Sequence, residues 1–182
     1  MASIVVLNGS PSNPSTTERL LTEVAHRMRG HGHLTSLINV RDLPAAALVT
    51  ADLGDPGIVA GIAEVVAADA LVVASPVYKA SYSGLLKTFV DLLPPNCLAG
   101  TPVLPFVTGG SVGHVLALDQ GLKPLLAALG ATTIARGRFV ESGHIGPAGL
   151  SEPTAAKVAG TVDDFALDIA VHSRTRLAAV AV

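Results

Sequence analysis

Short apolar runs alternate along this chain with segments whose apolar residues recur at helical spacing. A β-branched run at residues 4–7 predicts a first buried strand, and further runs predict strands at residues 34–40, 70–75, 102–108 and 132–140. Between the first two runs, one helical face carries Leu20, Leu21, Val24, Ala25 and Met28. Further helices are predicted after Asp55-Pro56, after Ser83, at residues 114–129 and at residues 154–177.

This alternation predicts an α/β fold in a single domain over residues 1–182. Right-handed crossovers and the connection lengths predict a doubly wound three-layer sandwich, with five parallel strands in the flavodoxin-like order 2-1-3-4-5. We expect Pro105 to weaken the fourth strand, because proline cannot donate to the ladder. We also expect a kink at Gly121 or Pro124 in the fourth helix, and a mobile connection at residues 141–153.

Three loops are predicted to meet at the carboxyl ends of the central strands, where a sheet of this order binds ligands. They comprise residues 9–17, 76–82 and 109–113, and none contains Cys, Asp or Glu. Acid–base or nucleophilic catalysis would need such groups in the crevice, where only His114 is within reach at the end of the third loop. We therefore predict no catalytic protein residue, and a surface of hydroxyls and N–H groups for a ligand with its own reactivity.

The first loop joins a strand to a helix N-terminus, whose free N–H groups and dipole favour an anion. It lacks both the P-loop and the Gly-x-Gly-x-x-Gly spacing. Ser15 and Glu18 have the spacing of a capping box, which is the purely structural alternative. That alternative leaves Ser10, Ser12 and Thr17 unexplained.

The second and third loops have features of a site for a planar ring. Tyr78 and Tyr82 are the only tyrosines and lie in one loop, where they could wall a ring or simply pack over the end of the sheet. Gly109-Gly110 could be an ordinary turn, or could let the backbone approach a flat ligand without a Cβ in the way.

Composition narrows the functional classes. The chain is 49% hydrophobic with a net charge of −2, so it can bury a core but has no basic field for nucleic acid. A single cysteine, Cys97, excludes an internal disulfide, and we predict no metal site; His31 and His33 lie in a turn far from the crevice. No apolar stretch approaches the roughly 20 residues of a membrane span, so we expect a cytoplasmic protein without membrane contact.

Three blocks resemble the NAD(P)H-dependent FMN reductases of the flavodoxin-like superfold, and most closely the reductases of alkanesulfonate monooxygenase systems. They are Gly9-Ser10-Pro11 with Ser15, residues 75–88 with 91–94, and residues 103–110 with His114 and 122–124. The resemblance implies hydride transfer from NADPH or NADH to FMN, and supply of reduced FMN to a monooxygenase in sulfonate or sulfur assimilation.

The resemblance also implies where FMN binds. Its phosphate would contact Ser10, Ser12, Ser15, Thr16 and Thr17. Pro76, Val77 and Tyr78 would line the isoalloxazine and ribityl. Thr108, Gly109, Gly110 and Ser111 would face the polar edge of the ring.

Two departures from the family pattern carry predictions. The sulfonate reductases usually have arginine where this chain has Ser12 and Thr16, and losing both cations predicts weak, exchangeable FMN. Gln120 stands where some relatives carry an inserted aromatic residue within a π-bulge at an oligomer interface, so a π-bulge is expected here.

Two other functions remain open on the same fold, namely a flavodoxin-like electron carrier or FMN-binding module, and a quinone or azo reductase. A homodimer or homotetramer is expected, because the third helix carries more apolar residues than a helix with a solvent face needs: Leu85, Leu86, Phe89 and Leu93.

Overall fold

The computed structural model describes residues 1–180, with side chains up to His172. Its main sheet has five parallel strands in the order β2-β1-β3-β4-β5, as predicted. Their bounds are β1 Ser3–Asn8, β2 Leu34–Asn39, β3 Ala70–Pro76, β4 Val103–Gly109 and β5 Arg138–Glu141. The flavodoxin-like topology expected from the alternation of elements is confirmed.

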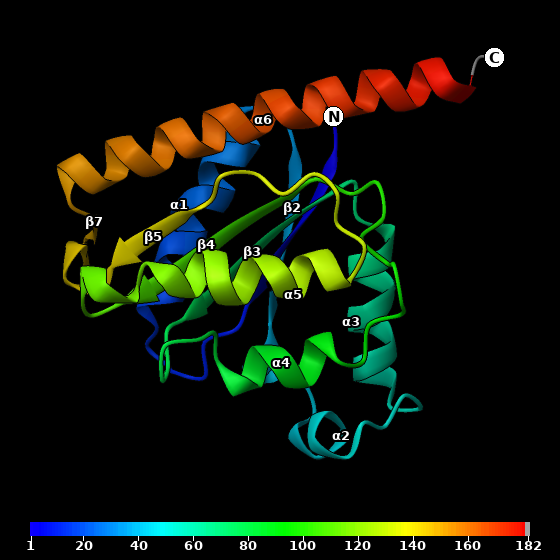
Figure 1. The fold of residues 1–182 in the computed structure, drawn as a ribbon, viewed down its shortest axis with the longest axis horizontal. Helices are drawn as coiled ribbons and strands as arrows, with labels where there is room; N and C mark the ends of the chain where they lie inside the picture. The colour runs from blue at the N-terminus through cyan, green and yellow to red at the C-terminus, as the bar shows by residue number, and fades with distance from the viewer. Residues whose placement is uncertain (181–182) are drawn as a thin grey trace.

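Helices cover both faces of this sheet (Figure 1). On one face lie α1 (Thr16–Gly30) and α6 (Glu152–Val180), and on the other lie α2 (Ala45–Thr50), α3 (Pro56–Ala67), α4 (Gly84–Val90) and α5 (Lys123–Ala128). No helix within residues 1–180 is long and apolar enough to cross a membrane.

The core consists of two layers separated by the strands. Alternate residues of β1 point to opposite faces, so Val5 and Leu7 pack with α3 and α4, while Ile4 and Val6 pack with α1 and α6. All four are at most 3% exposed. Burial on both faces explains why the strands read as continuous apolar runs rather than alternating ones.

The predicted strand at residues 132–140 is wrong at its start, because regular β5 begins only at Arg138. On this side of β4, Val103 donates to Thr133 and accepts from Ala135. Pro105 is the next β4 residue on the same side and has no N–H to continue the ladder. Opposite it, Gly137 adopts φ +66, where an added Cβ would meet the Pro105 carbonyl at 2.3 Å. Pro105 therefore shortens the neighbouring strand, whereas β4 itself is complete and buried.

We predicted a single helix after β4, and this prediction is wrong. The segment contains three successive types of helix. A 3₁₀ turn, η2 (Val112–His114), is followed by a π-helical segment, η3 (Leu118–Leu122), which continues into α5. The π segment contains Gly121 and is followed by Pro124, which cannot donate a hydrogen bond to the preceding turn. The expected π-bulge is confirmed, and the Gln120 side chain in it is exposed.

Two connections contain elements that the sequence pattern did not predict. The long link before α3 contains the short helix α2. Residues 141–153, expected to be a mobile connection, contain the 3₁₀ turn η4 (Ser142–His144) and a hairpin of β6 (Ile145–Gly146) and β7 (Gly149–Leu150). Ile145 is 4% exposed and packs in the core beside α1 and α6, which holds this hairpin against the domain.

The apolar face of α4 is buried within a single chain. Leu86 and Phe89 are completely buried, Leu93 is 7% exposed, and Leu85 packs partly buried against the same core. The inference of an oligomer interface from this helix is therefore wrong in its premise. The oligomeric state stays a prediction without support from these residues.

An ion-pair cluster fastens α6 to the last turn of α1. Arg27 donates from Nε and Nη2 to both carboxylate oxygens of Asp163, at 2.7 and 2.6 Å, and His31 Nε2 lies 2.7 Å from Asp163 Oδ1. The hydrogen bond from Arg27, followed by that from His31, lowers the pKa of Asp163 from 3.8 to about 2. The two turn histidines thus have structural contacts, since His33 Nδ1 accepts from the Ala2 N–H.

We expect Asp163→Asn to lower the free energy of unfolding at pH 7 by about 0.5–1 kcal/mol, the range of a solvent-screened pair. Because the folded-state pKa is depressed, this contribution is complete above the ordinary pKa near 4 and is lost as the pH falls through about 2. Denaturant titrations of wild type and variant at pH 7 and at pH 2–3 measure the difference. Asp164→Asn is the control, because Asp164 forms no ion pair among the described residues. An equal effect of both variants at pH 7 would contradict the assignment.

Candidate functional site

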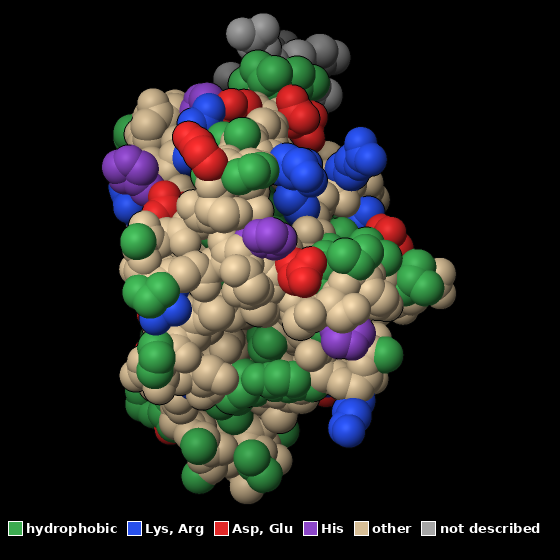
Figure 2. All heavy atoms as spheres, turned by 90° about the vertical axis from the view of Figure 1, so that its left-hand side faces the viewer, with side chains coloured by type: hydrophobic (Ala, Val, Ile, Leu, Met, Phe, Trp, Pro, Cys, Tyr) green, Lys and Arg blue, Asp and Glu red, His purple; other side chains and the backbone are tan. Residues whose placement is uncertain are grey.

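The three predicted loops leave the sheet side by side, because β1, β3 and β4 are adjacent and parallel. Figure 2 views the molecule from the side toward which the strands run in Figure 1. Most charged side chains on this face lie in its upper half, towards α6, whereas the lower half is mostly backbone, uncharged polar and hydrophobic atoms. Among the residues of the three loops only Lys79 carries a charge, so the candidate site is a largely uncharged surface at the topological switch point.

Gly9 is the junction at which the first loop leaves β1. Its N–H donates to the Ala74 carbonyl of β3 at 2.8 Å, and its carbonyl accepts from Ser83 Oγ at the start of α4. A Cβ on Gly9 would lie 2.7 Å from the Cβ of Leu86. The glycine of the Gly-Ser-Pro motif is thus required by the packing of β1 against α4.

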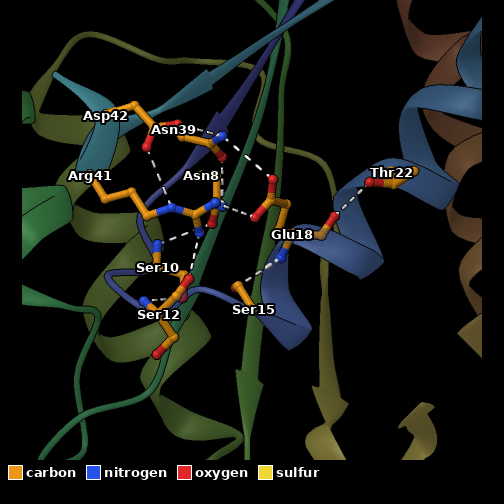
Figure 3. Close-up of polar contacts among 9 residues, drawn as sticks. All are labelled: Asn8, Ser10, Ser12, Ser15, Glu18, Thr22, Asn39, Arg41 and Asp42. Atoms are coloured by element: carbon orange, nitrogen blue, oxygen red, sulfur yellow. Dashed lines mark hydrogen bonds and ion pairs between the residues drawn. The ribbon is translucent and has the colours of Figure 1, made fainter. Parts of the chain in front are cut away.

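The rest of the first loop is shaped by its own polar groups (Figure 3). Asn8 Oδ1 accepts from the Ser10 N–H at 3.0 Å, and Ser10 Oγ accepts from the Ser12 N–H at 3.3 Å. Ser15 is the N-cap of α1 and accepts from the Glu18 N–H at 3.1 Å. Ser10 and Ser15 are 2% and 4% exposed, whereas Ser12 is open to solvent.

Thr17 and Thr108 connect the first helix to the end of β4. Their hydroxyl oxygens lie 2.7 Å apart, and each residue is 1% exposed. Each hydroxyl uses only part of its hydrogen-bonding capacity in this contact. The bond brings together two predicted site residues 91 positions apart in the chain.

The second loop begins where the Val77 N–H donates to the Thr108 carbonyl at 2.7 Å. Tyr78 and Ser81 then exchange two backbone hydrogen bonds around Lys79 and Ala80, which adopt φ +50 and +65. Positive φ at both central residues is what a type I′ turn requires, although it is uncommon for residues other than glycine, asparagine and aspartate. Tyr78 is 45% exposed beside this turn, whereas Tyr82 packs against the core, as the structural alternative predicted.

The third loop contains one glycine required by packing and one that faces open space. A Cβ on Gly109 would lie 3.0 Å from the Phe139 ring and 3.1 Å from His114 Nδ1, whereas a Cβ on Gly110 would meet nothing within 4 Å. Ser111, which is exposed, accepts from the Gly113 N–H. His114 Nδ1 is buried and has no hydrogen-bond partner among residues 1–172. Gly110 thus leaves free space for a ligand, whereas the unpaired His114 Nδ1 is enclosed by the protein.

The sequence interpretation missed one cation at the site. Arg41 follows β2 in the 3₁₀ turn η1 (Val40–Asp42), and its guanidinium reaches the first loop (Figure 3). It donates to the Ser12 carbonyl and forms an ion pair with Glu18, both at 2.5 Å. No local spacing in the sequence signals these contacts. Arg41 lies 29 positions from Ser12 and 23 positions from Glu18, and the three residues follow two neighbouring strands.

The groups that line the three loops can bind a ligand. The loops present serine and threonine hydroxyls, backbone N–H groups, the Tyr78 phenol and the Lys79 ammonium group, whereas the His114 Nδ1 atom is buried. Within the described part of the chain, no three His, Cys, Asp or Glu side chains gather as metal ligands would. A helix N-terminus flanked by hydroxyls suits an anionic group, and the open third loop suits a flat one.

Comparison with known proteins identifies the family. The family model for "NADPH-dependent FMN reductase" matches residues 2–144 of the sequence. The chain belongs to this family. It is an oxidoreductase that acts on FMN with NADPH or NADH, which favours the reductase over the electron-carrier alternative.

Individual relatives agree with this assignment. The chain is 41% identical to "FMN reductase (NADPH)" of Pseudomonas putida KT2440 over 82% of its own length and 76% of that protein. It is 36% identical to "NADH-dependent FMN reductase SfnF" of Pseudomonas fluorescens Pf0-1, with 85% of each covered. The crystal structure of the apo form of an NADH:FMN oxidoreductase, EmoB, superimposes with a TM-score of 0.86 at 39% identity, covering 92% of this chain and 90% of that one.

We expect Gly9→Ala to destabilise the reductase by about 1–3 kcal/mol, the usual cost of overpacking, because the new methyl group has no space against Leu86. The free energy of unfolding from denaturant titration measures it. Gly84→Ala is the control on the opposing helix, since nothing lies within 4 Å of a Cβ there. If the Gly9→Ala protein is as stable as the Gly84→Ala protein, the packing against Leu86 does not require glycine at position 9.

Proposed function

We propose that this reductase holds FMN loosely in the three-loop crevice and supplies reduced FMN to a flavin-dependent monooxygenase, in sulfonate or sulfur assimilation. The monooxygenase partner rests on the resemblance to sulfonate-system reductases. The observation that carries the binding site is a helix N-terminus surrounded by the hydroxyls of the first loop at the switch point.

The phosphate of FMN would bind the first loop, through the hydroxyls and N–H groups of Ser10, Ser12, Ser15, Thr16 and Thr17. The N-terminal N–H groups and dipole of α1 favour a dianion at this position. Ser12 is exposed and Thr16 half-buried, so both are accessible. Thr17 is bonded to Thr108, and its role is also to hold the loop against β4.

The isoalloxazine and ribityl would lie along Pro76, Val77 and Tyr78, with the ring edge at Thr108, Gly109, Gly110 and Ser111. Gly110 leaves room for close approach of a ring, because nothing lies within 4 Å of a Cβ there. The redox chemistry belongs to the flavin and the nicotinamide. The chain would bind and orient both, which requires no acid or base among its loops.

The proposed activity predicts that the purified protein oxidises NADPH or NADH only when FMN is added. Absorbance at the nicotinamide band, with each nucleotide in turn, measures the rate. Reactions without flavin are the control. Absence of flavin-dependent turnover with both nucleotides would refute the proposed function.

The charge balance of the site predicts an exchangeable flavin. The Arg41 cation is matched by Glu18 and by Asp42, whose carboxylate lies 3.6 Å from Arg41 Nε, so the first loop has no net positive charge for the phosphate. We expect a dissociation constant for FMN of about 1 μM or weaker at 0.15 M salt, measured by quenching of flavin fluorescence. A clearly submicromolar constant would contradict the exchangeable-flavin model.

A further inference from the structure

Arg41 is the only cation shown in the polar network behind the first loop in Figure 3. Its side chain is 13% exposed and comes from the connection after β2, outside the three loops of the site. Of the guanidinium nitrogens, Nη1 donates to the Ser12 carbonyl and Nη2 donates to a Glu18 carboxylate oxygen. Arg41 therefore joins the middle of the loop to the first turn of α1.

The bond to Ser12 orients a peptide group of the loop. In a trans peptide the carbonyl and the following N–H point in opposite directions. Because the Ser12 carbonyl points at Arg41, the N–H of Asn13 points away from it. The cation thus keeps a carbonyl dipole, which would repel an anion, on the Arg41 side of the loop.

The bond to Glu18 opens the capping box predicted from Ser15 and Glu18. One half of the box is present, since Ser15 Oγ accepts from the Glu18 N–H. In the other half, the glutamate side chain would accept from the backbone N–H of the N-cap residue. Here that carboxylate instead accepts from Arg41 and, at 3.5 Å, from Asn39. The Ser15 N–H is therefore not taken up by Glu18.

These contacts distinguish Arg41 from an ordinary surface ion pair. Without Arg41, Glu18 could turn back and close the box on the Ser15 N–H. The loop would then lose a donor and gain an unpaired negative charge at the N-terminus of α1. Both changes oppose binding of a phosphate dianion. They do not affect the binding of an uncharged part of the ligand, such as the flavin ring.

We propose that Arg41 is a positioning residue of the phosphate loop, which makes the loop receptive to an anion by holding the Ser12 carbonyl and drawing Glu18 out of the capping box. The proposal rests on the proposed function, in which this loop takes the phosphate of FMN. Arg41 would do so without touching the phosphate. It would replace, from a different strand, a part of what loop arginines supply in relatives that have them.

The test compares FMN with riboflavin, which has the same ring and ribityl chain without the phosphate. Dissociation constants for both come from fluorescence titration of wild type, Arg41→Gln and Arg41→Lys. We expect Arg41→Gln to weaken FMN binding about 10-fold, the loss of hydrogen bonds to a charged group, and to change riboflavin binding less than 2-fold. Arg41→Lys should fall between, because one ammonium cannot bridge both acceptors as a guanidinium does.

The double variant Arg41→Gln/Glu18→Ala tests the role of the capping box. Alanine cannot close the box, so this variant should regain several-fold in FMN affinity over Arg41→Gln. A purely structural Arg41 predicts no such recovery, because removing a second contact would only loosen the loop further. Arg27→Gln is the matched control. It removes the bidentate ion pair between Arg27 and Asp163 at the far end of the same helix, and it should leave the ratio of the FMN and riboflavin dissociation constants unchanged.

The outcomes separate the two proposals. Wild-type protein that binds neither flavin refutes the proposed function, and the role of Arg41 with it. Wild type that prefers FMN, together with an Arg41→Gln protein that keeps the same preference, refutes the role of Arg41 alone. Failure of the double variant to regain FMN affinity would overturn the capping-box step.

Discussion

The close approach of Gly9 to Leu86 is the constraint on which the site depends. It lets β1 pass directly beneath α4, with the Gly9 N–H bonded to β3 and its carbonyl bonded to Ser83. Ser83 in turn caps α4 and bonds through its N–H to Ser75 at the end of β3. One residue without a side chain thus sets the direction in which the first loop starts, and the same contacts place the second loop beside it.

Hydrogen bonds at Thr17 and Thr108 hold the other parts of the site together. The Thr17–Thr108 bond closes the gap between the first helix and β4, and the Thr108 carbonyl receives the N–H that starts the second loop. Buried polar groups with partners make a rigid, specific arrangement. The buried Thr17 and Thr108 therefore hold the loops together, whereas Ser12 and Thr16 are open to the ligand that we propose.

Charge enters this site indirectly. The loop itself carries no cation, and the guanidinium of Arg41 is matched by two carboxylates behind it. This arrangement orders the loop without adding net positive charge, which suits the exchangeable flavin that we propose. The π-helical segment supports the second loop by packing. A Cβ on its Gly121 would lie 3.3 Å from Ser81 Oγ, so this helix lies directly against the loop.

The sequence by itself determined the order of the strands, the three loops of the crevice and the absence of acids and bases in them, because these follow from periodicity, crossover handedness and residue type. It also indicated the π-bulge at Gln120. Only the tertiary structure decided that Pro105 shortens β5 rather than β4, that the apolar residues of α4 are core, and that Tyr82 packs inward while Tyr78 stays exposed. It alone brought Arg41 to the first loop, because a contact between neighbouring strands leaves no local spacing in the chain.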